Sequence, residues 1–145
     1  VIAMRITHEA DYAIRIVYLL ATLPEGGRMG AGTIAEQSSI SPRFTLKILR
    51  KLMIAGLVIS YKGVNGGYAL SRRPSEISVG EVIELINGPI LLNHCLDAEY
   101  ACSRSPIKSE CRFHKLFCKM NASLRSALFK ETFDTFLEDD DSNLK

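Results

Sequence analysis

The sequence predicts a mainly α-helical protein that contains one two-stranded hairpin and has a long helix near its carboxyl end. Apolar residues recur at helical spacing in several segments, of which the clearest are 9–22, 42–55 and 78–87. Residues 57–70 instead alternate on either side of an Asn-Gly-Gly turn, which is the pattern of a β-hairpin. From Phe113 to Leu137, apolar residues return at helical spacing and predict the long helix.

The composition is that of an ordinary globular protein. The 145 residues are 47% hydrophobic and 23% charged, which suits one domain with an appended element. The longest apolar stretch is interrupted by Arg15 and is too short to span a bilayer, so we expect no membrane partner. No signal-peptide pattern opens the sequence, and we expect a cytoplasmic protein. Because disulfides rarely persist in that compartment, clustered cysteines favour metal or redox chemistry.

The first half of the chain carries signals for the ends of its helices. Residues 24–32 are rich in glycine and predict a loop, after which Thr33 is expected to cap a short helix. Pro42 follows Ser41, and proline is favoured at the first helical position after a serine cap. Gly56 is expected to end that helix in the left-handed conformation. The apolar face of the helix is predicted to consist of Phe44, Ile48, Leu49 and Leu52.

The second half is expected to contain three further parts. Ser78 is the predicted cap of the helix over 78–87, and Gly88 and Pro89 stop it. The cysteine-containing segment that follows lacks clean periodicity. We therefore predict a first domain, a cysteine-rich loop, one long dimerisation helix and an acidic tail, with the boundaries 4–88, 89–112, 113–137 and 138–145.

Positive charge is concentrated in the first half of the chain. Residues 1–73 contain ten Lys and Arg against four Asp and Glu, whereas residues 74–145 contain eight against twelve. This asymmetry is typical of a nucleic-acid-binding half joined to a second element.

Three helices followed by a hairpin, in this order, are the layout of a winged helix-turn-helix domain. In that arrangement the helix over 42–55 enters the major groove of DNA, and the hairpin forms the wing. Arginine can bind guanine bidentately, lysine and threonine reach phosphates or bases, and glycines let a backbone approach DNA closely. The predicted contacts with a double-stranded DNA operator are Arg43, Thr45, Lys47, Arg50 and Lys51 on the exposed side of the helix, and Lys62, Asn65, Gly66 and Gly67 in the wing.

All four cysteines lie between residues 95 and 118. Structural zinc sites use close pairs of cysteines, about two to four residues apart, and this segment contains no such pair. Wide spacing in a loop fits an iron–sulfur cluster, although Cys118 also fits a small buried apolar residue at the start of a helix. His114 follows Cys111 by three residues, which places both on one helical face. The predicted metal ligands are Cys95, Cys102, Cys111 and His114, with Cys118 as a further candidate.

The segments TIAEQSSISPRFTLKILRKLMIAGLV, KGVNGGYAL and ISVGEVIE resemble the iron–sulfur cluster regulators of bacteria, the IscR-like and NsrR-like winged-helix transcription factors. The resemblance covers nearly the whole chain. It implies a homodimer held by the long helix, and a 2Fe–2S or 4Fe–4S cluster bound by three cysteines. It also implies a fourth ligand, either a histidine at the place of His114 or an aspartate of the partner subunit at the place of Asp11. The cysteines are spaced more widely than in relatives, and Cys118 is additional.

These observations predict a dimeric, DNA-binding transcriptional regulator whose operator affinity depends on an iron–sulfur cluster. We rank His114 first as the fourth ligand, Asp11 second and Cys118 third. A zinc- or thiol-sensing winged-helix repressor without a cluster is the alternative within this class. A redox or electron-transfer protein is the alternative of another class, and we expect no enzyme because the sequence has no phosphate-binding loop or nucleophile–base motif.

Overall fold

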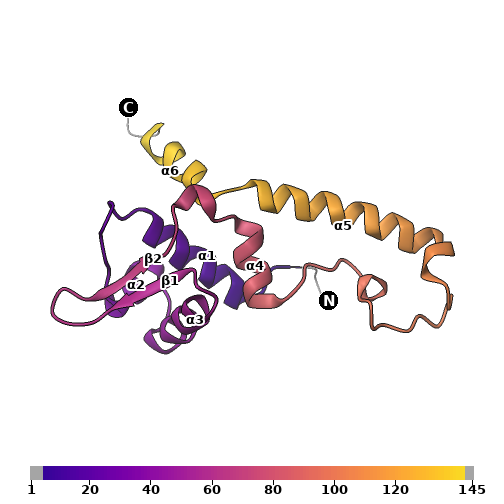
Figure 1. The fold of residues 1–145 in the computed structure, drawn as a ribbon, viewed down its shortest axis with the longest axis horizontal. Helices are drawn as coiled ribbons and strands as arrows, with labels where there is room; N and C mark the ends of the chain where they lie inside the picture. The colour runs from indigo at the N-terminus through magenta and orange to yellow at the C-terminus, as the bar shows by residue number, and fades with distance from the viewer. Residues whose placement is uncertain (1–4, 143–145) are drawn as a thin grey trace.

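The computed structural model describes residues 5–142 and has an elongated shape. A body formed by α1 to α4 and a hairpin lies at one end, and α5 extends away from it with the cysteine-containing segment along its far half (Figure 1). None of the helices within residues 5–142 has the length and apolar character needed to cross a membrane. The helices are α1 (His8–Ala21), α2 (Ala31–Ser38), α3 (Pro42–Ile54), α4 (Val79–Asn87), α5 (Arg112–Lys130) and α6 (Phe133–Ser142), and the strands are β1 (Val58–Tyr61) and β2 (Gly67–Leu70).

The ends of α3 and α4 follow from local signals. The Ser41 hydroxyl accepts a hydrogen bond from the N–H of Phe44 at 3.4 Å, and Pro42 occupies the first turn, where its missing N–H costs nothing. Gly56 follows α3 with a φ of 75°, the conformation that glycine adopts most easily. Ser78 caps α4 in the same way, since its hydroxyl accepts from the N–H of Glu81 at 3.1 Å. These predictions from the sequence are confirmed.

Helix α2 begins earlier than the sequence predicts. It starts at Ala31 after an extended Gly30, so Thr33 lies inside the helix and is not its cap, and the predicted loop reaches only to Gly30. The start is instead set by the wing. Met29 forms an antiparallel bridge with Tyr68, with hydrogen bonds of 3.0 and 2.8 Å between their backbone N–H and carbonyl groups. That bridge anchors the chain immediately before α2, which no local pattern in the sequence reveals.

The wing is the predicted antiparallel hairpin, with Val58 opposite Leu70 and Tyr61 opposite Gly67. Its two adjacent glycines have structural reasons of their own. A Cβ at Gly66 would overlap the carbonyl oxygen of Tyr61, and one at Gly67, where φ is 142°, would lie 2.8 Å from the carbonyl oxygen of Met29. Glycine is therefore required at both positions for the hairpin to close and to pair with Met29.

The carboxyl-terminal half contains two helices, so the prediction of one helix over 113–137 is wrong. Helix α5 ends at Lys130, and Glu131 is extended. The backbone then pairs with the start of α4, because the N–H of Val79 donates to the carbonyl of Glu131 at 2.8 Å and the N–H of Phe133 donates to the carbonyl of Ile77 at 3.2 Å. These bonds turn the chain back onto the body. Helix α6 includes residues 138–142 of the predicted acidic tail, and residues 4 and 143–145 lie outside the described part.

Phe133 is the largest side chain that is fully buried in the body, although the sequence pattern assigns it to the extended helix. It is 1% exposed and packs in one core with apolar residues from α1, α3 and α4. We expect Phe133→Ala to lower the free energy of unfolding by about 3–5 kcal/mol, because truncation leaves a cavity that the core cannot fully close. Chemical denaturation measures this loss. Phe136→Ala is the control, since Phe136 lies on the same helix and is 40% exposed, and an equal loss from both variants would contradict the assignment.

Candidate nucleic-acid interface and cysteine cavity

The outward face of α3 carries positive charge. Ile48, Leu49 and Leu52 are buried against α1 and α2, which leaves Arg43, Lys47 and Arg50 on the opposite, exposed face. Leu46 shares that face and is 52% exposed between the two arginines. Sequence reasoning missed Leu46, although its spacing from Arg43 and Arg50 would have placed it there. The face thus combines cations with an apolar side chain that can contact a thymine methyl group.

Two residues of α3 are placed differently from the prediction. Thr45, expected on the exposed side, is completely buried, and its hydroxyl donates to the carbonyl of Ser41 at 3.1 Å. It therefore cannot contact DNA from this position. Phe44, expected on the buried face, is 47% exposed and packs edge-on against Tyr12 of α1, with ring centroids 6.3 Å apart. The side of α3 that carries Thr45 packs against the core of the body. Burial of this short side chain is tolerated because its hydroxyl donates a hydrogen bond to the backbone at the start of the same helix.

Lys47 and Lys51 are both paired with an acidic residue of α1. Their ammonium groups lie 3.4 and 2.6 Å from Oε1 of Glu9. The nearby ammonium group of Lys51 is the main reason why the pKa of Glu9 lies below its usual value, and its effect outweighs the opposing effect of burial. Oε1 of Glu9 is itself buried, and no described residue meets it with hydrogen-bond geometry. Glu9 is therefore charged at neutral pH. Sequence reasoning missed it, because nothing local connects residue 9 with α3.

The tip of the wing is held by Arg28, which sequence reasoning also missed. Its guanidinium lies over the ring of Tyr61 at 3.6 Å from the centroid, and Nη1 donates to the carbonyl of Asn65 at 3.4 Å. Lys62 and Asn65 are exposed beside it. Arg28 reaches this place because the Met29–Tyr68 bridge brings its loop to the hairpin. Both the wing and the loop before α2 therefore present cations near the tip.

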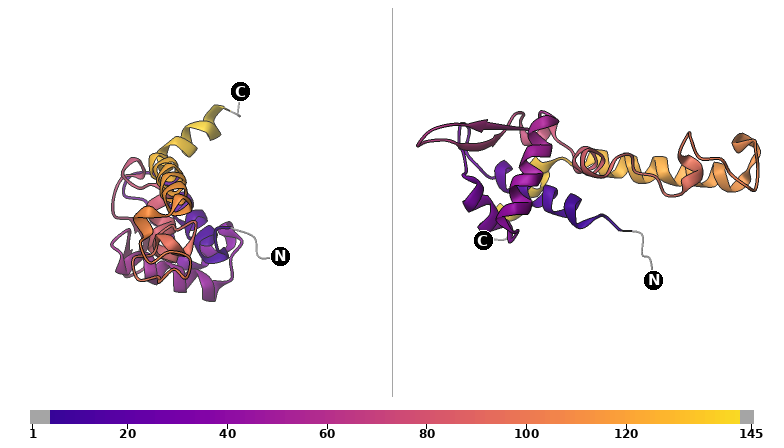
Figure 2. Two further views of the ribbon diagram at one scale, coloured as in Figure 1. Left: turned by 90° about the vertical axis from the view of Figure 1, so that its right-hand side faces the viewer. Right: turned by 90° about the horizontal axis from the view of Figure 1, so that it is seen from below.

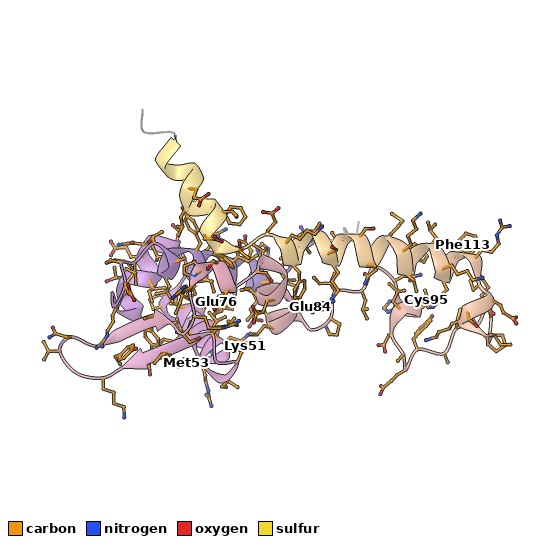
Figure 3. The ribbon with its side chains drawn as sticks, turned by 45° about the horizontal axis from the view of Figure 1, so that its top comes forward. Lys51, Met53, Glu76, Glu84, Cys95 and Phe113 are labelled. Atoms are coloured by element: carbon orange, nitrogen blue, oxygen red, sulfur yellow. The ribbon has the colours of Figure 1, made fainter. Side chains whose placement is uncertain are left out.

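The predicted thiol ligands meet in a cavity beside the amino-terminal end of α5. The cavity has a volume of about 420 Å³, and its lining includes Cys95, Cys102, Cys111 and His114. Cys95 is buried, whereas Cys102 and Cys111 are partly exposed. Figure 3 places Cys95 and Phe113 together at the end of the molecule that is far from the body. Three cysteines that are separated by six and eight residues in the sequence thus line one cavity with the histidine.

His114 lies between this cavity and Cys118. Its Nδ1 is buried and has no hydrogen-bond partner among the described residues, while its Nε2 lies 3.4 Å from Sγ of Cys118. A buried imidazole nitrogen without a partner is costly, so it indicates a group that a ligand would satisfy. Cys118 itself is exposed and lines a different hollow, with Leu91, Leu96 and Asn121. The structure therefore separates Cys118 from the other three cysteines.

The environment of Cys102 favours its thiolate. Hydrogen bonds from the backbone N–H groups of Ser105 and then Arg104 lower the pKa of the Cys102 thiol, and the positive charges of Arg104 and Lys108 act in the same direction. The thiolate is the form of cysteine that binds metals and reacts with oxidants. The loop around Cys102 thus stabilises the thiolate, which is the form needed both for metal binding and for reaction with oxidants.

The potential metal ligands of this region are the three cysteines and the histidine that line the cavity. Within residues 5–142, no three His, Cys, Asp or Glu side chains are gathered closely enough to hold one metal ion. Three cysteines and His114 nevertheless line the same cavity, and Nδ1 of His114 is buried without a partner among the described residues. Thiolates are the ligands that iron–sulfur clusters use. Asp11 is not in this set, because it lies on α1 in the body and pairs with Arg15 at 2.7 Å.

The comparison with known proteins decides the family. Residues 6–139 match the Rrf2 family, which is described as iron-dependent transcriptional regulators. The chain belongs to the Rrf2 family. A protein of Haemophilus influenzae, named as an HTH-type transcriptional regulator, is 32% identical over 86% of this chain and 81% of its own length. A Mycobacterium tuberculosis protein with the same kind of name is 38% identical over 60% of this chain. The match spans about half, 54%, of that relative's length.

Solved structures share the same fold. CymR of B. subtilis, described as a global cysteine regulator, superposes with a TM-score of 0.72 at 26% identity, over 91% of this chain and 95% of its own. IscR of T. potens superposes with a TM-score of 0.75 at 23% identity, over 99% and 93%. The expected resemblance and the winged-helix fold are thus confirmed. The Rrf2 family consists of transcriptional regulators, and this chain belongs to that family.

Proposed function

We propose that this Rrf2 protein is a dimeric, DNA-binding regulator whose operator affinity is controlled by an iron–sulfur cluster. The observation that carries the proposal is the cavity lined by Cys95, Cys102, Cys111 and His114, together with the buried Nδ1 of His114, which has no partner among the described residues. Three free thiols around one hollow, with a histidine beside them, are the donor groups that a cluster of this kind needs.

The contacts with DNA are assigned to α3 and the wing. Helix α3 presents Arg43, Lys47 and Arg50 on its outward face, as a helix that enters the major groove requires. Lys62 and Asn65 are exposed at the wing, where Arg28 adds a further cation. Gly66 and Gly67 have no side chain beyond the backbone of the wing, where a Cβ would not fit. Lys51 lies on the same side of the body as Lys47, because both lysines pair with Glu9. Thr45 has no part in this surface.

The cluster would be held by the three thiolates of the cavity and, as the fourth ligand, by His114. When bound, it supplies an iron site that iron supply, oxidation or nitric oxide can alter. Lowering of the Cys102 pKa keeps that sulfur ready to bind. A protein of this kind works in a reducing compartment, and we expect the cytoplasm.

Hydrogen bonds connect the cysteine-containing segment with the helices of the body, and we infer that a change in this segment can affect α3. That segment begins directly after α4, where Oδ1 of Asn87 accepts a hydrogen bond from the hydroxyl of Thr7 at 2.6 Å. Thr7 is also the cap of α1. From the other side, Arg125 of α5 donates to Glu84 of α4, with one contact at 2.7 Å. Movement of the cysteine-containing segment would therefore be passed from α4 to α1, and α1 packs against α3.

The homodimer is proposed from the exposed apolar side of α5. Phe113, Leu116, Met120 and Leu124 are each exposed by more than a third, although they recur along one helix. We expect an isologous dimer, because burial of this apolar face against the same face of a second copy removes both from water, and two-fold homodimers are the commonest oligomers. Sedimentation at micromolar concentration should give a dimer, and Met120→Lys with Leu124→Lys should give a monomer. Ile54→Lys is the control for a charge on an exposed apolar residue elsewhere, and a monomeric wild-type protein would contradict the prediction.

The test of the cluster is anaerobic purification followed by absorption spectra and iron and sulfide counts. We expect a brown protein in which iron and acid-labile sulfide occur in equal amounts. A colourless protein that contains zinc, or no metal, would instead support the zinc- or thiol-sensing regulator. A coloured protein that binds no duplex would favour electron transfer.

A further inference from the structure

An acidic residue lies among the cations that are assigned to DNA. Lys47 and Lys51 are one turn apart on α3, and their ammonium groups converge on a single oxygen, Oε1 of Glu9, at 3.4 and 2.6 Å. The Glu9 side chain is 26% exposed, whereas those of the two lysines are more open, at 53% and 39%. Figure 3 shows Lys51 in the body, at the end of the molecule opposite Cys95.

Stability alone gives a weak reason for this arrangement. Ion pairs between partly exposed groups contribute little, typically about 0–1 kcal/mol, and they hold long side chains in one conformation. An acid beside DNA-binding cations also opposes the field that attracts phosphates. Arg43 and Arg50, on the outward face of the same helix, form no ion pair with an acidic side chain among the described residues. Glu9 therefore acts on two particular lysines and leaves the arginines free.

The geometry around the shared oxygen is that of an anion site. Two ammonium groups that meet at one charged oxygen offer the same contacts to an oxygen of a phosphate group. Glu9 is held at this point by the first turn of α1, whose next residue, Ala10, is completely buried. The carboxylate thus enters the site from the protein side, and the lysines remain exposed on the other side.

We propose that Lys47 and Lys51 together form one phosphate-binding clamp for the DNA backbone, and that Glu9 is its built-in competing anion in the free protein. This inference rests on the proposed binding of DNA. A phosphate must displace the carboxylate before it gains both ammonium groups. Glu9 therefore cancels part of the sequence-independent affinity, while Arg43 and Arg50 remain available to read bases.

The test compares Glu9→Gln with Glu25→Gln by measuring binding of the full chain to operator and unrelated duplexes over a range of salt. Both variants lose one negative charge, but Glu25 lies in the exposed loop before α2, and the ion pairs of Lys47 and Lys51 among the described residues are with Glu9. Glu9→Gln is expected to bind both duplexes about five- to tenfold more tightly at low salt, and its plot of log affinity against log salt should be steeper by about one unit, as one added phosphate contact requires. Glu25→Gln should change little.

A second set of variants keeps the test decisive. The gain from Glu9→Gln should disappear when Lys47 and Lys51 are both alanine, and Glu9→Asp, which shortens the carboxylate but keeps its charge, should give a smaller gain. Weaker binding by Glu9→Gln would mean that the carboxylate positions the lysines, and it would overturn the proposal. So would equal gains from Glu9→Gln and Glu25→Gln, or a gain that persists without the lysines. If wild-type protein binds no duplex at all, the proposed function fails as well.

Discussion

Changing Arg43, Lys47 and Lys62 together to alanine is expected to remove specific DNA binding at physiological salt. Arg43 and Lys47 lie on the outward face of α3, and Lys62 lies on the exposed wing, so the variant removes cations from both elements that we propose contact the duplex. Each lost phosphate contact should lower the salt slope by about one unit and weaken all sequences alike. A lost contact with a base should cost about 1–3 kcal/mol and relax specificity at one position.

The matched control is Lys115, Lys119 and Lys130 changed together to alanine. All three are exposed on α5, and their loss changes the net charge by the same amount without touching α3 or the wing. Fluorescence anisotropy with operator and unrelated duplexes at several salt concentrations measures both effects. Wild-type affinity in the Arg43, Lys47 and Lys62 variant would remove the basis for assigning DNA contacts to this face.

Loss of His114 is expected to change the cluster itself. We expect His114→Ala to take up less iron and sulfide on reconstitution and to give altered absorption and paramagnetic resonance spectra. The physical reason is the position of Nδ1, which is buried without a partner on a residue that lines the cavity of the three thiols. Cys118→Ser should keep most of the wild-type spectrum, because Cys118 is exposed and lines another hollow.

The Asp11→Ala variant distinguishes a cluster that is bound by one chain from a cluster that is shared between two subunits. Asp11 lies on α1, which belongs to the body, whereas the cysteine cavity lies near the far end of α5. The right-hand view in Figure 2 shows the same separation of the body from the far end of α5. Asp11 could therefore reach a cluster only from the partner subunit. If Asp11→Ala bleaches the protein while His114→Ala keeps the wild-type spectrum, our ranking is wrong and the cluster is shared between subunits.

Local chemistry made the first domain predictable from the sequence. The cap of α3 needs only a serine hydroxyl followed by proline, and the hairpin needs only alternating residues around Asn65 and its glycines. Such signals act over a few residues, so they can be recognised in the sequence without knowing how the rest of the chain folds. The family resemblance rests on the same segments. The set of candidate ligands was also visible, because cysteine and histidine are few and clustered.

Contacts between distant segments decided what the sequence pattern could not. Helical periodicity continues from α5 into α6, but backbone bonds from residues 131 and 133 to residues 79 and 77 break the helix and bury Phe133. Thr45 and Phe44 exchange their expected sides because the core, through neighbours on other helices, selects the face of α3. Glu9 reaches Lys47 and Lys51, and Arg28 reaches the wing, across separations of more than thirty residues. The sequence by itself determined each element and its chemistry, whereas only the tertiary structure decided which charges are paired, because that depends on distances in space between residues far apart in the chain.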